Sequence, residues 1–240
     1  TREGGGARRA IYLRRADAAS PIKIGDGFGD GLSPNGKLAL CHDGGKLHVL
    51  PTGTGEEREL KIQGSFENGV VWFPDNKRVV IAGAVDKGAY QLHVLDTLDE
   101  TIKAISPENI AGAGSGIRPF ALSPDGRFVA GLTAQQMIAL YPTDGAGNAV
   151  PVPAALQGEI PVQWSSDGTS LYVYKPSAMP AQVFRINLAS GARELWKEFS
   201  PADPSGVYKI APVMITPDAT AYAYDSLRTM SDLYLIEGLR

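Results

Sequence analysis

A turn signature that recurs five times at nearly even spacing constrains this chain more than any other feature. Each copy has Ser, Thr or Phe, then Pro or Ser, then Asp or Asn, and three of the copies add Gly. The copies begin at Ser33, Phe73, Ser123, Ser165 and Thr216, so their starts lie 40, 50, 42 and 51 positions apart. One four-stranded blade of a β-propeller occupies about 40–50 residues. The spacing therefore predicts one blade for each copy.

The residue types in the signature are those of a tight hairpin. Proline presets φ, Asp or Asn accepts hydrogen bonds from nearby main-chain N–H groups, and Gly adopts a positive φ. We therefore interpret the aspartates of the signature as turn residues and not as catalytic acids. Asn76 and Ala219 replace the glycine in two copies, so we expect those two hairpins to be looser or of another turn type.

The residues on either side of each turn have the pattern of paired strands. The position before the turn is always large and apolar, and the position three before it is apolar in four of five copies. This period of two predicts a first strand. The sixth to eighth positions after the turn start are mostly apolar, which predicts a second strand covered on both faces. Trp72 and Trp164 align with core leucines of other copies, so we expect them to pack in the core.

Third and fourth strands complete the predicted blades. Third strands are expected at 47–50, 92–95, 138–141, 183–186 and 233–236, and fourth strands at 59–62, 102–105 and 193–196. Residues 89–106 also fit an amphipathic helix, but their register with the other copies favours strands. The segments 10–14 and 21–24 match the outer two strands of a further blade. We therefore predict one all-β domain over 1–240, with a half-blade at 8–26 and blades at about 27–65, 66–110, 111–156, 157–200 and 207–240.

Composition supports this fold class and excludes several kinds of protein. The 28 glycines and 17 prolines among 240 residues leave few stretches long enough for helices, which excludes an all-α protein. The net charge of −3 does not favour nucleic-acid binding. The single cysteine, Cys41, cannot form an internal disulfide, and no apolar run is long enough to span a bilayer. The chain opens without methionine, so we read it as a piece of a longer protein.

The repeat resembles a known propeller family. Ser-Pro-Asp-Gly at 123–126 is similar to the hallmark hairpin of the TolB-type, WD-like β-propeller repeat. The stretches 11–17, 32–37, 195–198, 201–207, 215–218 and 227–235 resemble the propeller region of bacterial transmembrane Ser/Thr protein kinases. The resemblance implies an extracytoplasmic sensor region, attached to the membrane only through a tether outside this chain.

Sequence motifs for catalysis are missing from the chain. It has no glycine-rich phosphate loop, His-Arg-Asp or Asp-Phe-Gly of a kinase, and no Gly-x-Ser-x-Gly of a hydrolase. His48 and His93 occupy the same place in two third strands, so we expect solvent-facing residues and not metal ligands. We therefore expect a non-catalytic binding protein without cofactor or metal. Two alternatives remain: a TolB-like periplasmic interaction scaffold, and the propeller half of a prolyl-oligopeptidase-type peptidase.

The entry ends of the first strands form the best candidate for a ligand site. In a propeller these strands line a central channel, and polar side chains that converge on a concave mouth are a common binding site. The candidate residues there are Glu67, Asn68, Arg118, Glu159, Tyr208 and Lys209. The partner would be a protein, a peptide or a small molecule. The half-blade either pairs with the last blade to close a five- or six-bladed ring or leaves an open edge at which two copies could form a homodimer.

Overall fold

The computed structural model describes residues 9–230 except 16, 18, 44, 87, 113–116 and 177, and at 67 and 68 it describes the main chain alone. Every regular element in this part of the chain is a β-strand, which confirms the all-β prediction. The described residues contain no helix long and apolar enough to cross a membrane. Residues 233–236, the predicted third strand of the last blade, lie outside the described residues.

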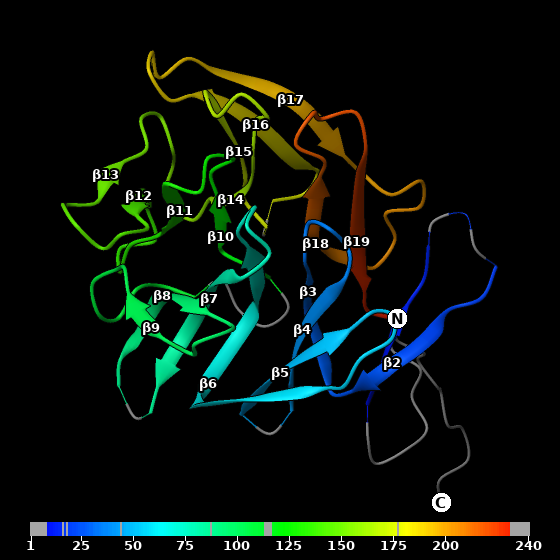
Figure 1. The fold of residues 1–240 in the computed structure, drawn as a ribbon. Coiled ribbons are helices and arrows are strands. Elements are labelled where there is room, and N and C mark those ends of the chain that lie inside the picture. Colours follow the sequence, from blue (N-terminus) through cyan, green and yellow to red (C-terminus); the bar gives the residue numbers. More distant parts are fainter. Residues whose placement is uncertain are drawn as a thin grey trace, which may run out of the picture.

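The strands form antiparallel sheets that follow one another around a common centre (Figure 1). The N-terminal hairpin consists of β1 (Ala10–Leu13) and β2 (Ile22–Asp26). The first blade contains β3 (Phe28–Leu32), β4 (Leu38–Asp43), β5 (Lys46–Pro51) and the start of β6 (Arg58–Trp72). The second contains the end of β6, β7 (Arg78–Val85), β8 (Tyr90–Asp96) and β9 (Ile102–Ala104).

The remaining sheets repeat the same order. The third blade contains β10 (Phe120–Leu122), β11 (Phe128–Leu132), β12 (Ile138–Pro142) and β13 (Val150–Pro151). The fourth contains β14 (Ile160–Trp164), β15 (Ser170–Tyr174), β16 (Ala181–Asn187) and β17 (Arg193–Phe199). The last described sheet pairs β18 (Val207–Ile215) with β19 (Tyr222–Arg228). The first strand of each blade lies innermost (Figure 1), and β3 contacts β6, β10 contacts β14, and β14 contacts β18.

One strand belongs to two blades. β6 pairs with β5 through its first residues and with β7 through its last, so the first two blades form a single seven-stranded sheet. The register shifts between Glu67 and Val70, where a bulge bends the strand. Sequence analysis predicted two separate strands here, because the inner and outer segments match different positions of the repeat.

The five turns share one backbone conformation. Their fourth residues, Gly36, Asn76, Gly126, Gly168 and Ala219, all have φ between 56° and 71°. Each donates its N–H to the carbonyl of the first turn residue at 2.8–3.1 Å. The expectation of a looser or different turn at Asn76 and Ala219 was therefore wrong. The remaining hydrogen bonds of the turn hold these two residues in the left-handed region that glycine adopts more easily.

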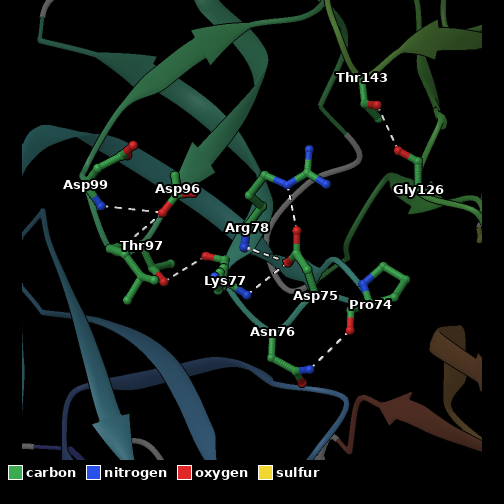
Figure 2. A network of polar contacts seen from close by, with 11 residues as sticks. Pro74, Asp75, Asn76, Lys77, Arg78, Asp96, Thr97, Asp99, Gly126 and Thr143 are labelled. Atoms are coloured by element: carbon green, nitrogen blue, oxygen red, sulfur yellow. Dashed lines mark hydrogen bonds and ion pairs between the residues drawn. The ribbon is translucent and has the colours of Figure 1, made fainter.

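The aspartate side chains of the turns accept hydrogen bonds from main-chain groups of their own turns. In Figure 2, Asp75 accepts hydrogen bonds from the N–H groups of Lys77 and Arg78 and pairs with the Arg78 side chain. Asp125, Asp167 and Asp218 each accept a main-chain N–H two residues further on, at 3.0–3.1 Å. This confirms that the aspartates shape the backbone.

In three blades, a threonine in the turn after the third strand donates a hydrogen bond to the main chain of the repeated turn. Thr97 Oγ1 donates to the Lys77 carbonyl at 2.7 Å, and Thr143 Oγ1 donates to the Gly126 carbonyl at 2.8 Å (Figure 2). Thr52 repeats this contact with Gly36 in the first blade, at 2.6 Å. Each of these three blades therefore has a hydrogen bond between the two turns at one of its ends, and the donor is the threonine that follows the third strand.

Burial agrees with the predicted pattern in four of the five copies. The middle residues of β4, β7, β11 and β15 are buried, whereas β19 is mostly exposed, so the prediction of a covered second strand is wrong for the last copy. Segment 89–106 forms β8 and β9, as its register predicted. Trp72 and Trp164 are buried, and their indole N–H groups donate to carbonyls of the preceding blade. His93 is buried rather than solvent-facing, and burial lowers its pKa.

Candidate functional site

A cavity of about 170 Å³ lies where the inner strands of three blades meet. Its lining residues come from β6 and the following turn, from β10 with its flanking residues, and from β14. They are Val71, Trp72, Pro74, Arg118, Ala121, Leu122, Ser123, Pro124 and Gln163. Inner strands line the central channel of a propeller, so this cavity belongs to the channel.

Arg118 reaches from the entry of β10 into the channel. Its Nη1 donates a hydrogen bond of 3.3 Å to the main-chain carbonyl of Val70 in the neighbouring blade. Arg118 lies five positions before its turn, whereas Val70 lies three before its own. The guanidinium therefore lies two strand positions deeper than the Arg118 backbone, inside the channel rather than on its rim.

The charge of Arg118 is not balanced by any described carboxylate. Within the described part of the chain, its hydrogen bond to Val70 is its one polar contact, and no Asp or Glu lies within ion-pair distance. Removal from water lowers the pKa of Arg118, yet arginine stays protonated in proteins. Arg118 is half-buried. Because charges removed from water in proteins are normally paired, a cation without a described carboxylate partner beside a cavity is a feature of binding sites.

Gln163 is a cavity residue that sequence analysis did not single out. It lies two positions before its turn, as do the cavity residues Val71 and Ala121. Gln163 is half-buried, and a bulge in β14 lies at this position. The repeat alignment contained a signal for this residue. At the equivalent position Val71 and Ala121 are small or apolar, whereas Gln163 carries an amide.

Glu159 has a different setting from the one predicted. Its side chain is 4% exposed and pairs with Arg193 through two contacts, one of 2.5 Å and one of 3.0 Å. It also accepts the N–H of Leu156, and the Arg193 guanidinium lies 3.9 Å from the ring centre of Phe184. Glu159 therefore fastens the loop between the third and fourth blades to the outer strand β17, and it does not line the cavity.

Two more of the predicted site residues lie on β18. Tyr208 is 57% exposed, and Lys209 is half-buried at the start of β18. Neither residue lines the Arg118 cavity. The side chains of Glu67 and Asn68 lie outside the described part of the structure. Of the four predicted residues whose side chains are described, Arg118 is the one that the structure places against this cavity.

A second hollow of about 530 Å³ lies between the third and fourth blades, at the end where the turns are found. It is lined by Ser123, Pro124, Asp125, Phe128, Leu140, Trp164, Ser166, Asp167, Gly168 and Leu188. Its two carboxylates are those that already accept hydrogen bonds from their own turns. We therefore take the Arg118 cavity as the candidate site, since its charged group is not used by the local backbone.

One histidine–aspartate pair lies elsewhere in the first blade. His42 Nδ1 is 2.8 Å from Asp30 Oδ2, and the imidazole stacks on Phe28 with ring centres 4.9 Å apart. Burial raises the pKa of Asp30, although the contact with His42 acts against this. Among the described residues no cluster of three or more His, Cys, Asp or Glu side chains has the arrangement of a metal site.

Blades of this order and register define the chain as a β-propeller, and comparison with solved structures gives the kind of propeller. It is similar to putative TolB from Agrobacterium tumefaciens, with a TM-score of 0.65 and 19% identity, over 92% of this chain and 84% of that protein. TolB from Acinetobacter baumannii gives a TM-score of 0.60 and 12% identity over 91% of this chain. The fold is therefore that of a TolB-like β-propeller.

The same fold is also found in an enzyme. A puromycin-hydrolyzing peptidase from Mycobacterium tuberculosis gives a TM-score of 0.59 and 18% identity over 81% of this chain. The chain spans 60% of the length of the Acinetobacter TolB and 33% of that of the peptidase. The sequence matches no protein-family model and none of the curated proteins with which it was compared.

Proposed function

We propose that this chain is a non-catalytic binding propeller, and that it is the extracytoplasmic sensor region of a membrane Ser/Thr protein kinase. The observation that carries the binding function is the Arg118 guanidinium, which lies beside a cavity in the channel and has no carboxylate partner among the described residues. The kinase link is supported by the sequence resemblance of the opening and closing segments. The turn aspartates favour binding over catalysis, because each is held by its own backbone.

A ligand in this cavity would touch three blades at once. The lining residues belong to the second, third and fourth blades, so binding would add contacts between sheets that otherwise meet only along their faces. A ligand that binds the folded state alone also stabilises that state. In the proposed sensor, this change would pass to the kinase through the position of the propeller or through pairing of two copies.

The binding function is tested by thermal unfolding of the chain against a panel of anionic, neutral and cationic small molecules and short peptides. A ligand at a hundred times its Kd stabilises the folded state by about 2.7 kcal/mol. The entropy of unfolding for 240 residues is about 0.5 kcal/mol per degree. The midpoint should therefore rise by about 5 °C for a true ligand, and no rise with any member of the panel would contradict the proposal.

The enzyme alternative is favoured by one specific observation, the similarity to the peptidase fold. Assays of peptide cleavage and ATP turnover on this chain should stay at background under the present proposal. The coding sequence on either side separates the candidates further. A kinase domain and one apolar span upstream support the sensor, a signal peptide alone supports a TolB-like scaffold, and a hydrolase domain downstream supports the peptidase.

A further inference from the structure

The chemistry around Arg118 narrows the kind of ligand that this propeller can hold. The inference rests on the proposed binding function and adds to it the class of the bound group. We propose that the Arg118 cavity takes a carboxylate group, carried either by a small organic acid or by an acidic side chain of a peptide.

Hydrogen-bond geometry favours an oxygen anion. A guanidinium carries five N–H donors in a rigid fork, which matches the two oxygens of a carboxylate. One donor of Arg118 is used by the Val70 carbonyl, and within the described residues the others have no partner. A carboxylate in the cavity would satisfy the free donors and would balance the charge of Arg118.

Charge and surroundings favour a single negative charge. The cavity lining is mixed: Val71, Trp72 and Leu122 are apolar, whereas Arg118, Ser123 and Gln163 are polar. Beside the apolar residues an uncompensated charge is costly, so one cation is best matched by one monoanion. A phosphate dianion would leave one negative charge without a partner. The Gln163 side chain on the same cavity offers an amide N–H₂ that can donate to a carboxylate oxygen.

The size of the cavity limits how much of the ligand enters it. Pockets that hold a whole drug-sized ligand measure about 300–1,000 Å³, whereas this cavity measures about 170 Å³. A short group fits, such as a butyrate molecule or one acidic side chain. The rest of a longer ligand would remain outside the cavity, along the channel.

The test measures thermal unfolding of the whole chain with four matched probes at equal ionic strength. Butyrate, a monoanion, is compared with neutral butyramide, and acetyl-Ala-Glu-Ala-amide is compared with acetyl-Ala-Gln-Ala-amide. We expect a rise of about 5 °C at a hundredfold excess over Kd with a carboxylate probe and none with its neutral partner. A rise with butyrate alone assigns a free acid, and a rise with the Glu peptide assigns a peptide side chain.

Three variants test whether the rise in the unfolding midpoint depends on the Arg118 cavity. Arg118→Met should remove the rise, whereas Arg127→Met, at an exposed position outside the cavity, should leave it unchanged. Gln163→Glu places a carboxylate in the cavity itself, so it should raise the midpoint by about 2 °C without any ligand and abolish the response to the probes. The Gln163→Glu result does not depend on the identity of the ligand, and a lowered midpoint would count against the proposal.

The outcomes of these tests distinguish the carboxylate assignment from the proposed binding function. If inorganic phosphate stabilises the chain more than either carboxylate, or if Arg118→Met responds as the native chain does, the carboxylate assignment is wrong. If neutral or cationic members of the wider panel stabilise the chain while carboxylates do not, the binding function stands and this inference falls. If nothing in the panel binds, both fall.

Discussion

The repeated turn allows a prediction in which two similar substitutions have opposite effects. Gly36 has a φ of 69° and an added Cβ would meet nothing within 4 Å. Gly53 likewise has open space around it, but its φ does not lie in the left-handed region. A Gly→Ala change at either site therefore adds no clash, and any difference between the two must come from the backbone.

The expected magnitudes follow from two terms. An L-residue in the left-handed region costs about 1–2 kcal/mol. Loss of glycine restricts the unfolded chain and stabilises the fold by about 0.4–1 kcal/mol. Gly36→Ala should therefore destabilise by about 1 kcal/mol, and Gly53→Ala should stabilise by about 0.4–1 kcal/mol. With about 0.5 kcal/mol of unfolding entropy per degree, the midpoints should fall by about 2 °C and rise by about 1–2 °C.

Calorimetry or urea denaturation of the two variants beside the native chain provides the assay. Unchanged slopes in urea would show that the unfolded state is comparable in all three proteins. Equal effects of the two substitutions would refute the reasoning, because the variants differ in φ and not in packing.

Three further predictions concern other contacts. Glu159→Ala leaves Arg193 without its partner and should cost about 3 kcal/mol in urea denaturation, whereas Glu194→Ala, in an exposed pair, should cost less than about 1 kcal/mol. Hydrogen bonds within its turn lower the pKa of Asp167 to about 2. Its contribution to stability is therefore complete above the ordinary pKa near 3.8 and is lost as the pH falls through about 2, so an Asp167→Asn variant should differ from the native chain at pH 6 and match it below pH 2. Trp164→Phe removes the hydrogen bond to the carbonyl of the preceding blade and should lower stability by about 1 kcal/mol, and an unchanged urea midpoint would show that this bond contributes nothing.

The sequence was sufficient for the fold because the turn chemistry is local. Proline, Asp or Asn and the fourth residue determine each hairpin within a few positions, and the period of two then assigns the flanking strands. The turn type at Asn76 and Ala219 was not predicted. Asn adopts the left-handed region more easily than other non-glycine residues, whereas at Ala219 the hydrogen bonds of the turn impose a positive φ on a residue that does not prefer it.

The candidate site was predicted less completely because long side chains and distant partners decide it. Arg118 was predicted at the mouth of the channel from its position in the repeat, and its side chain extends two positions further than its backbone. Glu159 is held by Arg193, which lies 34 positions away on an outer strand. His93 is buried by neighbouring strands although it aligns with His48, which is half-buried. Pairings of this kind depend on how blades pack, and the repeat alignment carries no information on them.

The continuous strand β6 limits where new chain ends can be introduced in this propeller. Between the second and third blades the described residues 105–112 and 117–119 lie outside any strand, as do residues 152–159 between the third and fourth blades. Between the first and second blades the chain passes through β6 itself. A circular permutation with new ends near residue 64 would break a hydrogen-bonded strand, while new ends near residue 146, in an exposed turn, would break none. A cut between the first two blades would therefore disrupt their shared seven-stranded sheet, and an exposed turn such as that at residue 146 is the better place for new chain ends.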